Sequence, residues 1–141
     1  MAPRIVIDTN ILVSALRSRK GASFRLLTLI DSGKFDLCVS VPLVLEYEAT
    51  ANKQLRTTGL KVSDVEAIID YICHVAKHYK VYYLWRPFLK DPKDDMVLEL
   101  AVSSNAEFIV TYNRSDFKGS EQFRIRTISP HEILEQIGEV S

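Results

Sequence analysis

The chain has 141 residues, of which 47% are hydrophobic and 26% charged, and its 18 basic and 18 acidic side chains give a formal net charge of zero. This length predicts one domain, spanning residues 1–141, and this composition excludes an intrinsically disordered protein. Zero net charge argues against a strongly basic nucleic-acid-binding module, but it leaves room for an enzyme with a small local binding surface.

Cysteine usage and hydropathy indicate the compartment. Cys38 and Cys73 lie in apolar stretches without the spacing of a metal site, which favours free thiols in a reducing environment. No apolar run approaches the ~20 residues of a membrane span, and Asp8 interrupts the N-terminal apolar run too early for a signal peptide. We therefore expect a soluble, cytoplasmic protein without membrane association.

Short apolar runs alternate with helical periodicities along the chain. The runs predict five strands, at residues 5–7, 35–40, 81–85, 108–111 and 125–128. Apolar residues at helical spacing predict helices at residues 10–17, 24–30, 42–54, 63–76 and 94–102, and from residue 130 onward. The third strand would carry the aromatic residues Tyr82, Tyr83 and Trp85, either in the core or at an interface.

Helix start and stop signals support several of these boundaries. Pro42 and Pro130 suit the first turn of a helix, and Gly33 suits the position just after one. Ser63 and Glu66 have the spacing of a capping box, and Asp94 or Asp95 is expected to cap the following helix.

Strands that are separated by helices must run parallel, with helices on both faces of the sheet. The predicted fold is therefore α/β, a three-layer α/β/α sandwich with a mostly parallel, roughly five-stranded sheet. Ligands of such open sheets bind outside the carboxyl ends of the strands.

Acidic or amide side chains follow four of the predicted strands. Listed in chain order, they are Asp8, then Glu46, then Asp94 and Asp95, then Asn113 and Asp116. Carboxylates gathered at one edge raise one another's pKa values unless a cation lies among them, and Mg²⁺ is the cation that prefers oxygen ligands. The pattern predicts a Mg²⁺ site at this edge of the sheet.

Other interpretations of these residues remain open. Taken singly, Asp8 suits a helix cap, Glu46 an exposed helix position and Asp116 a turn. His74 and His78 have the i, i+4 spacing of a metal-binding pair, but no third ligand is near them in the sequence. Neither a glycine-rich phosphate loop nor a G-x-S-x-G nucleophile motif is present.

Four segments carry a resemblance to a known family: IVIDTNILVSAL, VPLVLEYEA, KDPKDDMVLELA and FIVTYNRSDF. Together, in this order and spacing, they resemble the PIN domain, and more narrowly the VapC-like toxin ribonucleases of bacterial or archaeal toxin–antitoxin pairs. The resemblance covers nearly the whole chain. It implies an endonuclease, a hydrolase that cleaves single-stranded RNA with Mg²⁺ or Mn²⁺.

The resemblance also assigns residues to roles. It implies Asp8, Glu46 and Asp94 as the catalytic, metal-binding acids, with Asp95 as a supporting ligand. Thr9 and Asn10 would orient Asp8, and Thr111 would end the fourth strand. Asn113 stands where many members have an acid, so either Asn113 or Asp116 would complete the site, and a second metal ion would be held more weakly by a neutral amide.

Basic residues near the expected site predict where RNA binds. The first thirty residues contain five basic side chains against one acidic, a local charge of +4. Arg17, Arg19 and Lys20 follow the first helix, and Arg114 lies beside the fourth strand; a solvated loop is the alternative for the first group. Tyr112 is either a base-stacking residue or a partly buried strand end.

Partners are implied by the resemblance alone. Such proteins are commonly homodimers, are neutralised by a cognate antitoxin protein, and act on single-stranded or structured RNA. Two alternatives from another class remain: a receiver-like signalling module, and a PIN fold that has lost activity and only binds protein or RNA. Asn113 favours the inactive fold, whereas the single acid of the first strand disfavours a receiver.

Overall fold

A parallel sheet forms the centre of the molecule in a computed structural model that describes residues 2–81 and 88–140. Its five strands are β1 (Arg4–Ile7), β2 (Asp36–Val39), β3 (Lys77–His78), β4 (Phe108–Val110) and β5 (Arg126–Ile128). Their order across the sheet is β3-β2-β1-β4-β5, and every pairing is parallel. The predicted α/β class with a mostly parallel five-stranded sheet is confirmed.

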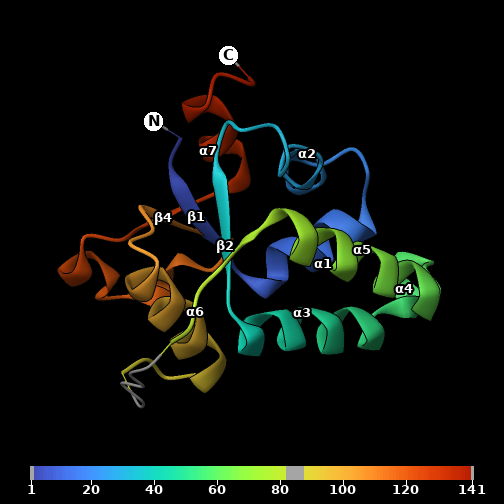
Figure 1. The fold of residues 1–141 in the computed structure, drawn as a ribbon, viewed down its shortest axis with the longest axis horizontal. Coiled ribbons are helices and arrows are strands. Elements are labelled where there is room, and N and C mark those ends of the chain that lie inside the picture. The colour runs from blue at the N-terminus through green and yellow to red at the C-terminus, as the bar shows by residue number, and fades with distance from the viewer. Residues whose placement is uncertain (1, 82–87, 141) are drawn as a thin grey trace.

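Within the described ranges, seven α-helices connect and flank the strands (Figure 1). They are α1 (Thr9–Arg17), α2 (Ala22–Thr28), α3 (Val41–Lys53), α4 (Leu55–Thr58), α5 (Val62–Val75), α6 (Pro92–Ser103) and α7 (Pro130–Gln136). Two short 3₁₀ turns, η1 (Arg114–Phe117) and η2 (Ser120–Phe123), lie between β4 and β5.

The strand order fixes the layers. The chain moves outward from β1 to β3 through α1 to α5, and then returns past β1 to β4 through α6. Because crossovers between parallel strands are right-handed, this reversal places α6 on the opposite face from the earlier helices. Accordingly, α6 packs on β1, β2 and β4, whereas α2 and α7 pack on each other.

Buried apolar side chains from both layers meet at the sheet. Val6, Val39 and Ile109 on the central strands are fully buried, as continuous apolar strands in such sheets should be. The same reversal of direction creates a switch point at the carboxyl ends of β1 and β4. In Figure 1 the two chain termini lie at the opposite end of the molecule from α3.

The strand that follows α5 lies earlier in the chain than the strand predicted at residues 81–85. The strand that pairs with β2 is Lys77–His78, and the backbone N–H of Tyr79 extends it by donating to the Val39 carbonyl at 2.9 Å. Both strand residues are exposed at the sheet edge, so no apolar run marks them. Residues 82–87, including the aromatic residues Tyr82, Tyr83 and Trp85, lie outside the described residues.

Two predicted helix caps are also wrong. The helix expected to begin at Ser63 begins at Val62, and the Asp64 carboxylate, rather than Glu66, accepts the N–H of residue 61 at 2.9 Å. Asp91, not Asp94 or Asp95, caps α6 by accepting the backbone N–H of Lys93. In both cases the helix starts earlier than the first apolar residue of the pattern.

The cysteines are free, as expected. Cys38 is buried in β2, and Cys73 is partly buried on α5. None of the helices in the described ranges has both the length and the apolar composition that crossing a bilayer requires.

Candidate active site

Asp8 stands at the carboxyl end of β1, where it joins β1 to both α1 and β4. Its Oδ1 accepts the backbone N–H of Thr9 at 2.9 Å, which caps α1. Its Oδ2 accepts the hydroxyl of Thr111 at 2.7 Å, and its own N–H donates to the Val110 carbonyl at 2.9 Å. The carboxylate is therefore held in one orientation from two strand ends.

Burial raises the pKa of Asp8 above its ordinary value, since the residue is only 8% exposed. The hydrogen bonds from Thr111 and Thr9 lower that pKa, and the negative charges of Asp116 and Asp91 raise it again. The two hydrogen bonds thus keep a buried carboxylate closer to its charged form.

Asp94, in the first turn of α6, experiences the strongest influence of neighbouring acids. Burial is the largest cause that raises its pKa, to about 7, followed by the charge of Asp8 and then that of Asp116. Smaller contributions in the same direction come from Asp91 and Asp95. The acids that follow β1, begin α6 and lie in η1 are therefore near enough at one edge of the sheet for their charges to act on one another.

Glu46 projects from α3 into a groove beside these acids. Its Oε1 accepts the hydroxyl of Thr50 at 3.0 Å and lies 3.3 Å from the Nζ of Lys93. The groove has a volume of about 500 Å³. Its polar lining includes Asn10, Arg17, Glu46, Thr50, Gln54, Lys93, Tyr112 and Asn113.

Asn113 and Asp116 follow β4 on the exposed side of the site. The backbone N–H of Asn113 donates to the Thr111 hydroxyl at 3.0 Å, so the Thr111 oxygen links Asn113 to Asp8. The backbone N–H of Asp116 donates to the Asn113 carbonyl at 3.1 Å. Asn113 lines the groove, whereas Asp116 acts on Asp8 and Asp94 through its charge.

These groups fit a hard divalent cation by their chemistry. All of them offer oxygen atoms as ligands, and burial followed by mutual repulsion raises the pKa values of Asp8 and Asp94. Among the described residues, the buried Asn10 Oδ1 has no hydrogen-bond partner. Among residues 2–81 and 88–140, no three His, Cys, Asp or Glu side chains lie close enough together to hold a metal ion by themselves. Mg²⁺ keeps several waters and needs only one or two carboxylates, so this spacing suits it.

Most of the chain, including the segments that carry these residues, matches a model of a protein family. A model described as PIN domain matches residues 4–115, which include Asp8, Glu46, Asp94 and Asn113. The chain belongs to the PIN domain family. PIN domains are generally nucleases that use divalent metal ions.

A solved structure with the same fold agrees with this family. A chain in the crystal structure of VapBC2 from Rickettsia felis, bound to a DNA fragment from their promoter, superposes with a TM-score of 0.62. The superposition covers 89% of this chain and 99% of that chain, at 15% sequence identity, so the likeness is one of fold. No curated protein sequence matches the chain.

Within this PIN domain, Asp95 differs from the other acids. Its side chain is 2% exposed, and its carboxylate accepts the backbone N–H groups of Leu89 at 2.8 Å and Phe88 at 3.4 Å. These bonds tie the start of α6 to the segment that precedes it. The carboxylate of Asp95, which was predicted to be a supporting metal ligand, thus accepts hydrogen bonds from two backbone N–H groups.

The predicted RNA-binding residues of the PIN domain fall into separate groups. Arg17 lines the groove, while Arg19 and Lys20 are exposed just beyond α1. Arg114 forms an ion pair with Glu132 of α7 instead of facing the groove freely. Tyr112 is 52% exposed and lines the groove, with its hydroxyl 2.6 Å from the Ser23 Oγ.

The histidine alternative is wrong, because the two side chains do not share a helix. His74 lies on α5, whereas His78 lies in β3 after the helix has ended. The Nε2 of His78 is 2.6 Å from the carbonyl oxygen of Cys73.

Two contacts at this PIN site had no signal in the sequence. Tyr47 is fully enclosed, and its hydroxyl donates to the Ile7 carbonyl at 2.5 Å, which ties α3 to the residue before Asp8. Lys93 pairs with Glu46 across two helices. By contrast, the Asp91–Pro92 step is a recognisable helix start, with a capping acid before a first-turn proline.

Proposed function

We propose that this PIN domain is a metal-dependent endoribonuclease that hydrolyses phosphodiester bonds of single-stranded RNA. The observation that carries the proposal is the gathering of Asp8, Asp94 and Asp116 at the carboxyl edge of the sheet, near enough for their charges to act on one another, beside a groove of about 500 Å³. Carboxylates that raise one another's pKa values are the usual environment of a divalent cation.

Asp8, Glu46 and Asp94 would hold Mg²⁺ or Mn²⁺, directly or through its bound waters, with Asn113 or Asp116 completing the set. A cation bound there supplies Lewis-acid activation of water and neutralises charge on the scissile phosphate. Thr111 and the Thr9 N–H hold Asp8 in the orientation that binding requires. Asp95 is left out of this set because it is 2% exposed and both of its oxygens are directed toward the segment before α6, at the N–H groups of Phe88 and Leu89.

Arg17 and Tyr112 are the groove residues best suited to RNA. The guanidinium of Arg17 would contact phosphate, and the half-exposed ring of Tyr112 would stack on a base. Arg19 and Lys20 extend the basic surface beyond α1, so binding should weaken as salt rises.

Cleavage of labelled single-stranded RNA by the purified chain, with Mg²⁺, Mn²⁺ or a chelator, tests this function. Asp8→Asn should lower the cleavage rate by at least about 10²-fold, because loss of a group that only orients a ligand already costs 10- to 100-fold. Asp36→Asn is the matched control, since Asp36 is a partly exposed acid at the amino end of β2. Wild-type rates in Asp8→Asn, or cleavage in chelator, would contradict the proposal.

We further propose that the protein is the toxin of a toxin–antitoxin pair and acts in the cytoplasm as a homodimer. The support is its fold likeness to a chain of VapBC2, a complex whose printed description includes promoter DNA. An antitoxin encoded beside this chain should co-purify with it and suppress its RNA cleavage. Light scattering of the chain alone, after size-exclusion chromatography, tests the homodimer.

One observation favours a second candidate, an inactive PIN fold that only binds RNA or protein. Asn113 is neutral where an acid is usual, and no three acids of the described residues form a ready metal cluster. Calorimetric titration with Mg²⁺ separates the two candidates. Binding that is lost in Asp94→Asn supports the enzyme, and absence of binding in the wild type supports the inactive fold.

A further inference from the structure

Lys93 is a basic residue placed against one of the acids of the site. Its Nζ lies 3.3 Å from the Glu46 Oε1, and both side chains line the groove that also contains Arg17 and Tyr112. Lys93 directly precedes Asp94 in the first turn of α6. The ammonium group therefore sits beside Glu46, one of the carboxylates that the proposed function assigns to a divalent cation, and Lys93 is next in the chain to a second, Asp94.

Stability is a poor explanation for this pair. The side chain of Lys93 is 61% exposed, and ion pairs at such positions contribute little to folding. The molecule contains a comparable pair elsewhere: Lys77 lies 3.3 Å from Asp36, with side chains that are 56% and 30% exposed. That pair joins β3 to the start of β2 and lines no part of the groove.

A lysine side chain can exchange one anionic partner, such as a carboxylate, for another, such as a phosphate. Its ammonium is a compact point charge with three donors on a flexible four-carbon stem, and it binds phosphate readily. A divalent cation on Glu46 would repel an ammonium group at 3.3 Å, so the two compete for one carboxylate. Once displaced, the Lys93 side chain stays within the groove, where an RNA strand would present its phosphates.

We propose that Lys93 is a phosphate-binding residue of the groove, which Glu46 holds until a divalent cation engages that carboxylate. The displaced ammonium then contacts an RNA phosphate next to the scissile bond. This inference rests on the proposed function, because it assumes that RNA occupies the groove.

Metal affinity is the first test. In calorimetric titration without RNA, Lys93→Gln should bind Mg²⁺ at least about threefold more tightly than the wild type does, because a competing positive charge has been removed. Lys77→Gln, which breaks the comparable pair at the far edge, should leave the Mg²⁺ affinity unchanged. Thermal melting of both variants should match the wild type closely.

RNA binding is the second test. In steady-state cleavage of labelled single-stranded RNA, Lys93→Gln should raise KM roughly five- to tenfold. It should also reduce the slope of log affinity against log salt by about 0.7, the contribution of one phosphate contact on a single strand. Lys93→Arg keeps the charge and should restore most of the affinity, whereas Lys77→Gln should behave as wild type.

The outcomes separate this inference from the proposed function. If Lys93→Gln binds Mg²⁺ more tightly but keeps the wild-type KM and salt slope, Lys93 is only a counter-ion of Glu46 and the inference is overturned. Unchanged Mg²⁺ affinity would overturn it equally, since Glu46 would then not be shared. If the wild type itself cleaves no RNA, the proposed function fails, and the calorimetric comparison still decides whether cation and lysine compete.

Discussion

Asp8 serves two purposes with one carboxylate. Its Oδ1 starts α1 by accepting the Thr9 N–H, and its Oδ2 accepts the Thr111 hydroxyl from the end of β4. A helix cap and a member of an acidic site were alternatives in the sequence, and the structure shows both at the same residue. The two hydrogen bonds fix the orientation of the side chain that the proposed function assigns to a cation.

Thr111→Val removes the hydrogen bond to Asp8 and nearly preserves the size of the side chain. The hydroxyl lowers the pKa of Asp8, so its loss should raise that pKa further and should slow RNA cleavage about 10- to 100-fold. Because a higher pKa delays formation of the carboxylate, the acidic limb of the pH–rate profile should move to higher pH. Thr111→Ser should restore both values, and an unmoved acidic limb in Thr111→Val would exclude this role.

The start of helix α6 carries three acids, and each makes different contacts. Asp91 caps it, Asp94 faces the coupled acids, and Asp95 anchors the two preceding backbone N–H groups. Three acids within five residues thus have three different environments. Helical geometry separates them, because adjacent residues of a helix point about 100° apart.

Asp95→Asn distinguishes an anchor from a metal ligand. An amide has one acceptor oxygen, so one of the two backbone N–H groups loses its partner, and the free energy of unfolding should fall by about 1–3 kcal/mol. Mg²⁺ affinity should change by less than about threefold, since only a nearby charge is removed. Chemical denaturation and calorimetry measure these two effects, and a loss of Mg²⁺ binding as large as in Asp94→Asn would make Asp95 a ligand.

Patterning predicted most of the helices and strands of the fold. The central strands are continuous apolar runs, so β1, β2 and β4 were expected within one or two residues of their observed bounds. Edge strand β3 was missed because Lys77 and His78 are exposed and polar. An element that buries no apolar face leaves no hydrophobic pattern, and only its backbone pairing with β2 identifies it.

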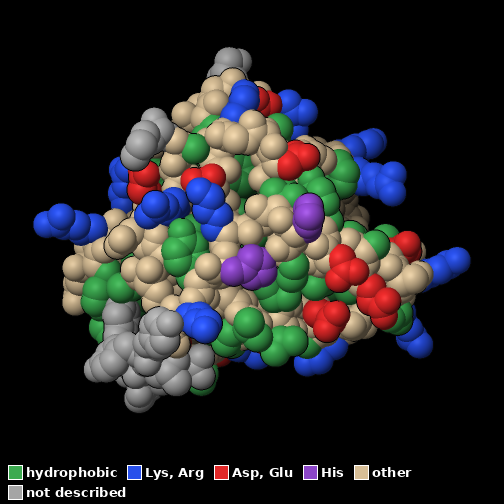
Figure 2. All heavy atoms as spheres, viewed as in Figure 1, with side chains coloured by type: hydrophobic (Ala, Val, Ile, Leu, Met, Phe, Trp, Pro, Cys, Tyr) green, Lys and Arg blue, Asp and Glu red, His purple; other side chains and the backbone are tan. Residues whose placement is uncertain are grey.

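At the scale of the molecule, zero net charge results from charges that are separated in space. On the face drawn in Figure 2, acidic side chains gather over α5 and α4, and basic side chains are scattered over the left half of the face and around the margin. The groove carries its own mixture, with Arg17 and Lys93 against Glu46. Overall charge therefore says little about the binding surface.

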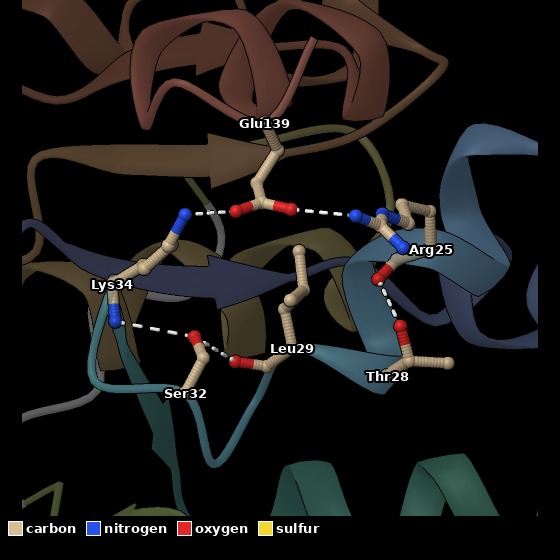
Figure 3. A network of polar contacts seen from close by, with 6 residues as sticks. All are labelled: Arg25, Thr28, Leu29, Ser32, Lys34 and Glu139. Carbon is tan, nitrogen blue, oxygen red and sulfur yellow. Dashed lines mark hydrogen bonds and ion pairs between the residues drawn. The ribbon is translucent and has the colours of Figure 1, made fainter.

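The Glu139 carboxylate ties the end of the described chain to α2 and to the turn before β2. Glu139 accepts from Arg25 of α2 at 2.7 Å and also pairs with Lys34 in the turn before β2 (Figure 3). Gly138, with φ of +81°, ends α7 in a Schellman motif that directs Glu139 toward α2. The tail thus fastens α7 to the layer formed by the first helices.

Glu139→Gln should loosen this contact. The two basic partners lower the pKa of Glu139, so its stabilising effect is present above the pKa of the unfolded chain and is lost as pH falls through the lower folded value. The variant should melt a few degrees lower at neutral pH and low salt, and the difference should vanish in acid. Melting curves across pH measure this, and an equal difference at every pH would mean that the charge is not responsible.

The sequence alone determined the α/β class, the central strands and the acids that follow them, because burial and strand-end chemistry are local patterns. It also carried the motifs of the PIN family. The tertiary structure decided how those acids are used: which one is held by Thr111, which one serves the backbone, and which one meets Lys93. These assignments depend on contacts between residues far apart in the chain, and spacing along the sequence does not contain those distances.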